Sequence, residues 1–474
     1  MKGFGKQTAL LCAFLLTASL TVPASANSAQ SHWRGVNATG AIITGENCPI
    51  VVDHETLTFD IQQFPEQHYK AVSDYLAYTG KVTAEYTFHN PADYAVDATL
   101  VFPFGAIPDY AHIRDSETDQ LLRYFDTEKY DITVNGIPIE RTLRHTLIFW
   151  GHQFELESDM ANLHDGFMDD PFYAPDMPVT RYSYLPSGVD TETYNAADAA
   201  FVLSADPSKT RVYMERQNGG KTLDGGVLMQ GWVDPEEPYV VNVIGEPLEQ
   251  MPEWKFYENG ACEKEIDGTM TLVGTENTTL KEFLLQGYDP SSEILDYDWY
   301  NAMVTALNYF EWEHGAIHST EIGFDISDRL MRWYEYDISI GPGETIVNTV
   351  TAPIYPSINS RYEPSIYEYT YLLSPAKTWA EFGTLDIVVN TPFYMIEDGV
   401  VLALEQADSG YAAHLDGLPE GELTFTLCSE KVTKLPADMG YVYPEVLLIG
   451  AAAVIAALVI LVFVWRRRKR NRGA

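Results

Sequence analysis

A run of twenty uncharged residues, Val446 to Trp465, limits what this 474-residue chain can fold into. As a helix with a rise of about 1.5 Å per residue it would span roughly 30 Å, the thickness of the hydrocarbon core of a bilayer. Thirteen of the twenty residues are Val, Leu, Ile or Phe, and together they favour insertion by roughly 4 to 8 kcal/mol. The run predicts a transmembrane helix, so that the long segment before it folds on one side of a membrane.

The N-terminus has the pattern of a secretory signal peptide. Two lysines precede an apolar stretch from Ala9 to Leu20, and Ala24-Ser25-Ala26 matches a signal-peptidase site. Six basic residues follow the C-terminal apolar run, and Lys and Arg are enriched on the cytoplasmic side of membrane helices. We therefore expect a single-pass type I protein of the cell membrane, with residues 27–445 extracellular and a short basic tail, 466–474, in the cytoplasm.

The predicted extracellular part is strongly acidic. All 68 acidic residues lie between positions 27 and 445 together with 22 of the 30 basic residues, a balance of −46. Such a surface repels phosphate backbones, whose neutralisation by Lys and Arg dominates nucleic-acid affinity. Nucleic acid is therefore excluded as a partner. The expected partners are the membrane, through residues 446–465, and an extracellular protein or glycan whose identity the sequence does not define.

Cysteine usage indicates that burial, not a disulfide framework, stabilises the extracellular part. Cys48, Cys262 and Cys428 remain after the predicted cleavage. Three widely separated cysteines allow at most one internal disulfide, and their spacing matches no zinc-binding pattern. About 420 residues exceed what one hydrophobic core usually organises. Two or three β-rich units are therefore expected.

Alternation of apolar and polar residues predicts the fold class. Between Val82 and Pro103 the alternation continues on both sides of an Asn90-Pro91-Ala92-Asp93 turn, which predicts an antiparallel pair with one buried face. Asn135-Gly136 predicts a second hairpin, because both turn residues tolerate positive φ, and Pro138 marks its return strand as an edge. The chain is predicted to be mainly β, with antiparallel β-sandwich units, one long extracellular helix and a C-terminal transmembrane helix.

Helical patterns are confined to one stretch of the extracellular part. Residues 278–286 predict a short helix that ends at Gly287, and residues 292–313 predict the long one. The long helix has an apolar face formed by Trp299, Met303, Ala306 and Phe310. We expect this face to pack on a sheet.

These patterns divide the chain into nine segments. They are a signal peptide (1–26), an N-terminal β-sandwich region (27–154), an irregular acidic loop or insertion (155–200), a β region continuing the sandwich (201–276), a helical segment (277–316), a C-terminal β-sandwich region (317–434), a juxtamembrane linker (435–445), the transmembrane helix (446–465) and the basic cytoplasmic tail (466–474).

Two groups of residues are weak candidates for metal ligands. His314 and His318 lie four residues apart with Glu321 nearby, but Gly315 occupies the position where a zinc protease has its catalytic Glu. Asp165, Asp169 and Asp170 could offer oxygen ligands to calcium, although their spacing does not follow the EF-hand loop. No catalytic residue and no cofactor is predicted, and calcium is the ion that the aspartates would suit.

The segment from Val82 to Phe104 and the hairpin at Val134 to Gly136 resemble the opening strands of VIT-like sandwiches and of bacterial domain-of-unknown-function families. Tyr371 to Trp379, followed by Leu385-Asp386-Ile387, is similar to a closing segment of the latter. Leu435 to Gly440 resembles the sortase signal of Gram-positive bacteria, with Asp-Met-Gly in place of Thr-Gly. The resemblance implies a Gram-positive cell-envelope protein of β-sandwich type and supplies no catalytic residue.

Two functions remain open at this level. The first is a non-enzymatic protein that binds or scaffolds something outside the cell. The second is an envelope hydrolase or a metal-dependent enzyme whose site is assembled from residues distant in sequence. Titratable side chains that converge in one concave pocket would favour the enzyme, and carboxylates scattered over convex surfaces would favour the scaffold.

The predicted topology has a direct test. Protease added to intact cells should digest residues 27–445 where the envelope is accessible, and alkaline carbonate should leave the full-length chain in the membrane fraction. A chain that is protected from protease, or that carbonate releases, would contradict the topology.

Overall fold

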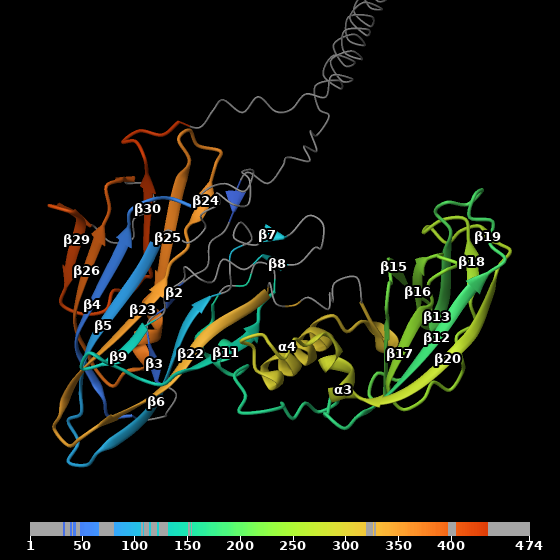
Figure 1. Ribbon diagram of the computed structural model, residues 1–474, viewed down its shortest axis with the longest axis horizontal. Coiled ribbons are helices and arrows are strands. Elements are labelled where there is room, and N and C mark those ends of the chain that lie inside the picture. Colours follow the sequence, from blue (N-terminus) through green and yellow to red (C-terminus); the bar gives the residue numbers. More distant parts are fainter. Residues whose placement is uncertain are drawn as a thin grey trace, which may run out of the picture. The chain divides into compact units, whose positions relative to one another are not determined.

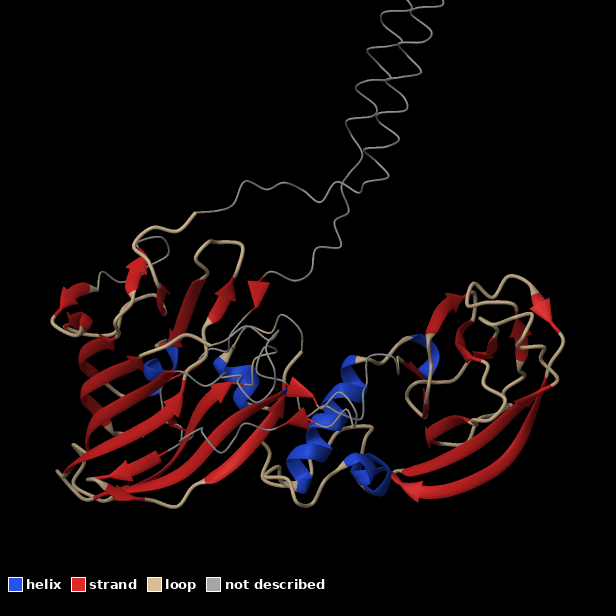
Figure 2. Cartoon of the chain, turned by 45° about the horizontal axis from the view of Figure 1, so that its top comes forward, coloured by secondary structure: helices blue, strands red, loops and turns tan. Residues whose placement is uncertain are grey.

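The computed structural model describes residues 32–33, 38–39, 41–43, 48–65, 80–105, 108, 113–114, 121–122, 131–149, 152, 154–318, 326, 329–396 and 404–434. The predicted signal peptide and transmembrane helix lie outside these residues. Among the described residues, no helix is both long enough and apolar enough to cross a bilayer. Strands, drawn red in Figure 2, contain about half of the described residues and far more of them than the helices do, which confirms a mainly β chain with several antiparallel sheets.

Three sheets surround the largest hydrophobic core and form a first sandwich. One layer is an eight-stranded sheet in the order β10 (Ile137–Pro138), β9 (Asp131–Val134), β23 (Thr345–Pro353), β5 (Gly80–His89), β4 (Val51–Ile61), β26 (Phe382–Asn390), β29 (Gly410–Leu415) and β28 (Glu405–Ala407). One opposing sheet has the order β11 (Thr142–Leu147), β22 (Leu330–Ile340), β6 (Val96–Gly105) and β3 (Ile42–Ile43). The other is a six-stranded sheet that contains β2 (Ala38–Thr39), β25 (Ile366–Leu372), β30 (Leu423–Cys428) and β27 (Tyr394–Ile396) together with the short strands β1 (His32–Trp33) and β24 (Ser357–Asn359).

Aromatic contacts join the layers of this sandwich. Phe59 on β4 lies edge-on to Tyr371 on β25 and to Phe425 on β30, with ring centroids 5.8 and 5.2 Å apart. Such edge-to-face pairs add stabilisation beyond the area that they bury. Along β4, alternate residues from Leu57 to Ile61 are fully buried, which is the period-two pattern of a strand with one face in the core.

The predicted pairing between Val82 and Pro103 is corrected by the structure. Both strands exist, but β5 pairs with β4 and β23, whereas β6 pairs with β22 and β3. The turn between them therefore crosses from one layer of the sandwich to the other. Asn90 holds this crossing, because its side-chain amide donates to the carbonyls of Tyr94, Ile340 and Gly341 at 2.8 to 3.0 Å. Alternation shows that each strand has a buried face but does not identify its partner.

The Asn-Gly hairpin is confirmed. Asn135 and Gly136 have φ values of 51° and 75° between β9 and β10. The Asn135 side chain also accepts from the amide of Val347, at 2.9 Å. Strand β10 carries Pro138 and ends the eight-stranded sheet, as its missing N–H requires.

A long insertion leaves and re-enters the first sandwich at neighbouring strands. Strands β11 and β22 pair in register from Thr142 and Glu335 to Leu147 and Leu330 (Figure 1). The ranges 27–154 and 317–434, which were predicted as separate regions, therefore contribute strands to the same sheets. Residues 201–276 do not continue this sandwich and instead form sheets of their own.

The second β unit has two five-stranded sheets around a separate core that includes Phe201, Met229 and Tyr239. The first sheet has the order β20 (Thr269–Thr279), β12 (Pro178–Ser187), β17 (Tyr239–Gly245), β14 (Thr210–Met214) and β21 (Ala316–Ile317). The second has the order β15 (Gly219–Leu223), β16 (Gly226–Trp232), β13 (Asp198–Leu203), β18 (Lys255–Tyr257) and β19 (Glu265–Ile266).

Strand β12 falls in residues 155–200, which were predicted as an irregular loop. The register between β12 and β20 shifts between Ser183 and Tyr184 because Val273 on β20 is left without a partner, so the bulge lies on β20. Along β12 the buried Val179 packs in the core formed with the helices, whereas Tyr184 packs in the core of the second β unit. The buried positions therefore do not follow one period-two pattern that the sequence would show. Pro178 and Pro186 near the ends of the strand further hide it.

Helices α3 and α4 follow β20 in the chain. Helix α3 (Leu280–Leu284) begins at a capping box of Thr279 and Glu282 and continues into the 3-10 turn η4 (Leu285–Gly287). Helix α4 (Asp296–Tyr309) lies within the predicted range 292–313 and buries Trp299, Met303 and Ala306 in a core with α3. The remaining elements are α2 (Leu156–Met160), η5 (Glu313–Gly315), η7 (Ser374–Thr378), β7 (Ile113–Arg114) and β8 (Leu121–Leu122).

Contacts divide the chain into two units, and the sandwich core, the insertion and the groove described below all belong to the larger one. In the smaller unit, Glu363 and Lys434 exchange backbone hydrogen bonds of 2.9 and 3.2 Å. No disulfide joins Cys48, Cys262 and Cys428 to one another.

A buried ion pair connects the insertion to the first sandwich. Arg144 on β11 and Asp298 on α4 are almost inaccessible to solvent, with 3.3 Å between the guanidinium and a carboxylate oxygen. Arg144 also donates to Glu335 at 2.8 Å and to the carbonyl of His164 at 2.6 Å. The amide of His145 donates to Asp298 at 2.8 Å. This network satisfies a buried guanidinium, which is costly to leave unpaired.

Replacing Asp298 by Ala should lower the free energy of unfolding by about 3–5 kcal/mol, because Arg144 would then be buried without its main partner. Urea unfolding of the purified protein measures the change. Lys264→Met breaks the exposed pair with Glu258 and should leave the midpoint nearly unchanged. Equal effects of the two substitutions would show that the buried pair has no special role.

A carboxyl group lies in the core of the first sandwich. Glu55 on β4 is 1% exposed, and its Oε1 has no hydrogen-bond partner among the described residues. Burial raises the pKa of Glu55 to about 8, although a hydrogen bond with Tyr86 opposes the shift. The side chain is therefore mostly protonated at neutral pH in the folded protein.

This raised pKa makes stability depend on pH. Between about pH 4.5 and 8 the folded chain binds more protons at Glu55 than the unfolded chain, so its contribution to stability is lost as the pH rises through this window. Glu55→Gln should match the parent near pH 5 and exceed it above pH 8 by a few kcal/mol, at about 1.4 kcal/mol per pKa unit. Thermal unfolding from pH 5 to 9 tests this, with the exposed Glu85→Gln on β5 as control. Parallel pH profiles for parent and Glu55→Gln would contradict it.

Candidate functional site

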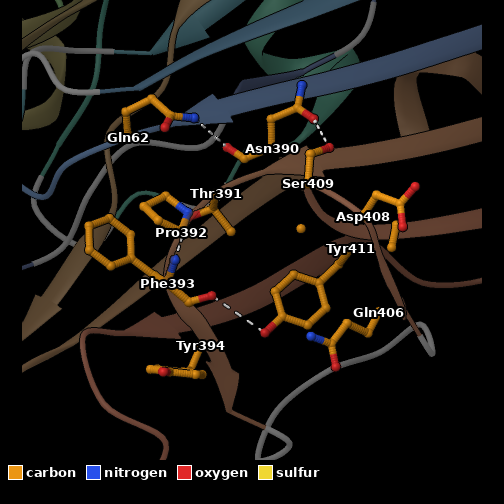
Figure 3. A pocket seen from close by; sticks show the side chains of 12 residues that line it. Gln62, Asn390, Thr391, Pro392, Phe393, Tyr394, Gln406, Asp408, Ser409 and Tyr411 are labelled. Atoms are coloured by element: carbon orange, nitrogen blue, oxygen red, sulfur yellow. Dashed lines mark hydrogen bonds between the residues drawn. The ribbon is translucent and has the colours of Figure 1, made fainter.

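A groove of about 440 Å³ lies at the ends of strands of the first sandwich (Figure 3). It is formed by the turn after β26, the start of β27, the β28–β29 hairpin and one residue beyond β4. The residues that line it are Gln62, Asn390, Thr391, Pro392, Phe393, Tyr394, Gln406, Ala407, Asp408, Ser409, Gly410 and Tyr411.

Asn390 organises one wall of the groove. It ends β26 beside Asp60 of the parallel neighbour β4, and its amide donates to the Asp60 carboxylate at 2.9 Å. Its side-chain oxygen accepts from the hydroxyl of Ser409 at 3.0 Å, and its carbonyl accepts from Gln62 at 3.2 Å. Asn390 thus connects the ends of β4 and β26 with the β28–β29 hairpin.

The β28–β29 hairpin requires a glycine at its tight end. Gly410 has a φ of 151°, and a Cβ at this position would collide with the carbonyl of Val389. The close approach lets Thr391 donate its amide to the carbonyl of Ser409 at 3.1 Å. The hairpin is thereby held against the end of β26, with Asp408 and Ser409 at its tip.

Aromatic rings form the opposite side. The ring of Phe64 lies between those of Tyr367 and Phe393, with centroid distances of 3.7 and 3.8 Å. The hydroxyl of Tyr411 accepts from the amide of Met395 at 2.8 Å and donates to the carbonyl of Phe393 at 3.4 Å. Tyr394 remains 39% exposed. These contacts hold the rings of Phe393 and Tyr411 in place.

The lining is suited to recognition of a polar molecule. Amides, hydroxyls and aromatic rings predominate, and Asp408 carries the one carboxylate among the twelve residues. Such sites orient a ligand by a few placed polar groups beside apolar contact area. The side chain of Asp408 makes no hydrogen bond or ion pair to other described residues, so it is available to a ligand.

The structure does not place His314 and His318 on one helix. Helix α4 ends at Tyr309, and His314 lies in η5 with a φ of 55°. The ring of His318, beyond β21, stacks on Trp312 with centroids 3.9 Å apart. Glu321 lies outside the described residues. Gly315, between the two histidines, has a φ of 74°.

The three aspartates of the calcium candidate have different surroundings. Asp165 is exposed, 3.7 Å from Arg144, and Asp169 is also exposed. Asp170 accepts from the amides of Phe172 and Tyr173 and from Asn308, each at 2.8 Å. Burial acts to raise the pKa of Asp170, but these hydrogen bonds lower it below its usual value. Within the described ranges, no three or more His, Cys, Asp or Glu side chains are grouped so that they could hold a metal ion.

Sequence reasoning did not find the groove. Gln62 and Asn390 are 328 positions apart and meet only because β4 and β26 are neighbours in the sheet. The one local signal is the turn composition of Asn390-Thr391-Pro392 and Asp408-Ser409-Gly410. Turn signals mark where a chain reverses and do not show which turns converge.

No family model matches the sequence, and no curated protein matches it. The chain is similar to a crystal structure from Legionella pneumophila subsp. pneumophila described as a "putative nutrient binding protein", with a TM-score of 0.32 and 9% identity over 84% of this chain and 72% of that one. At this TM-score we base no argument on the likeness.

Proposed function

We propose that this protein is a single-pass protein of the bacterial cell envelope whose extracellular first sandwich binds a small polar ligand in the groove between β26 and the β28–β29 hairpin. The groove is the observation on which the proposal rests. Its volume of about 440 Å³ falls within the range of small-molecule sites, roughly 300–1,000 Å³.

The sequence supports the location. A signal-peptide pattern at 1–26, an uncharged run at 446–465 and the basic tail together favour export with a retained membrane anchor. An acidic balance of −46 in residues 27–445 favours a soluble, self-repelling surface outside the cell.

Preorganisation supports binding at the groove. Its walls come from strand ends of two sheets of the first sandwich and from a hairpin fixed by Asn390, Ser409 and Gly410. A site on rigid elements loses little conformational freedom when a ligand binds. The side chain of Asp408 is also left available for a ligand.

Filling the groove should abolish ligand binding. Ala407→Trp places an indole in the lining, from an exposed position on β28 where the larger side chain can be accommodated. Full-length protein in detergent, exposed to small-molecule fractions of the cell envelope, is analysed for bound ligand by native mass spectrometry. Occupancy should fall at least about tenfold, which corresponds to about 1.4 kcal/mol.

Glu405→Trp is the matched control, because Glu405 is exposed on the same strand but does not line the groove. It should retain the ligand. If Ala407→Trp binds as much ligand as the parent protein while both remain folded, the groove is not the binding site.

A further inference from the structure

We infer that the ligand of this groove is an uncharged carbohydrate, held by Asp408 and Gln406 through pairs of hydroxyls and by Tyr394 and Tyr411 through ring contact. The inference rests on the proposed function, because it names the class of ligand for the same groove. Four properties of the lining support it.

The first property is charge. The twelve lining residues include no Lys or Arg, and Asp408 gives the lining a negative charge. A nearby cation, Lys431, lies 5.5 Å from the centroid of the Tyr394 ring and is not part of the lining. Phosphates, uronic acids and other anions would meet a carboxylate without a paired cation. The groove therefore favours a neutral or cationic ligand.

The second property is the hydrogen-bonding capacity of the lining. Gln406 and Asp408 lie on the β28–β29 hairpin, and their side chains make no hydrogen bond to other described residues. A carboxylate accepts two hydrogen bonds through its two oxygens, and an amide both donates and accepts. Adjacent hydroxyls of a sugar ring present donors and acceptors at the spacing that such groups can bind. Hydroxyls of such a ligand can donate to both carboxylate oxygens of Asp408, so that no positive charge on the ligand is needed.

The third property is the aromatic surface. Gln406 is the register partner of Tyr411, so an amide and a ring are presented together, as Figure 3 shows. Tyr394 adds a second ring that is 39% exposed. Aromatic rings carry apolar area with a fixed geometry, and the C–H faces of a sugar ring can lie on them while its hydroxyls reach the amides.

The fourth property is the small aliphatic content. Ala407 and Pro392 are the aliphatic members of the lining, so an acyl chain would bury little apolar surface and would cover amides and hydroxyls without satisfying them. The lining thus disfavours a lipid tail. Together with the charge and the free hydrogen-bonding groups, this favours a polyhydroxylated molecule without a negative charge, and a neutral carbohydrate is the ligand class that we infer.

Calorimetric titration of the full-length protein in detergent tests the inference. The probes are neutral hexose and N-acetylhexosamine oligomers of one to six residues, with oligogalacturonate as the anionic comparison. At least one neutral oligomer should bind, and oligogalacturonate should bind more weakly. Asp408→Asn and Tyr394→Ala should each weaken the neutral oligomer about tenfold or more. The controls Asp416→Asn, an exposed carboxylate beyond β29, and Tyr94→Ala, an exposed tyrosine elsewhere on the sandwich, should bind like the parent protein.

The outcomes separate this inference from the proposed function. If no neutral oligomer binds, or if oligogalacturonate binds more tightly, the carbohydrate class is wrong. In that case, if the parent protein binds a ligand from envelope fractions and Ala407→Trp does not, the groove is still a binding site, but for another class of ligand. If neutral oligomers bind equally well to the parent and to the Asp408 and Tyr394 variants, the proposed contacts are wrong.

Discussion

The contact between Arg144 and Asp298 is the interaction on which the arrangement of the larger unit depends. A buried guanidinium needs several partners, and here they come from α4, from β22 and from the carbonyl of His164. These groups belong both to the first sandwich and to the insertion that interrupts it. Burial raises the pKa of Asp298 to about 6 even though Arg144 opposes the shift. The network therefore carries a desolvation cost and is more demanding of geometry than an exposed ion pair.

The insertion explains how one sandwich is built from both ends of the chain. Strands β11 and β22 are antiparallel neighbours in one sheet of the first sandwich. The residues between them can therefore form a helical core and a second β unit without interrupting that sheet. The sandwich is then completed by C-terminal strands, with β26 parallel to β4. The groove arises at this late closure, since Gln62 comes from the early part of the chain and the other eleven lining residues come from the late part.

Local patterns predicted elements better than partners. The alternation around Tyr86 and Phe102 identified two strands, but the turn at Asn90 takes them into different layers. The Asn135-Gly136 turn was predicted correctly because positive φ at two successive residues restricts the backbone to very few turns. Strand β12 was missed because Val179 and Tyr184 are buried in different cores, so its buried positions do not follow one period of two. The groove had no comparable signal, since its lining residues are ordinary turn residues until the sheet brings them together.

The amino-acid sequence alone determined the properties that depend on neighbours along the chain. These are the period-two burial of strands such as β5, the turn at Asn135-Gly136 and the short helical segment that ends at Gly287. The tertiary structure decided which strands pair, where the insertion leaves the sandwich, and that Gln62 lies beside Asn390. The physical reason is that backbone preference and alternation act over a few residues, whereas sheet partners and grooves depend on packing between segments hundreds of residues apart.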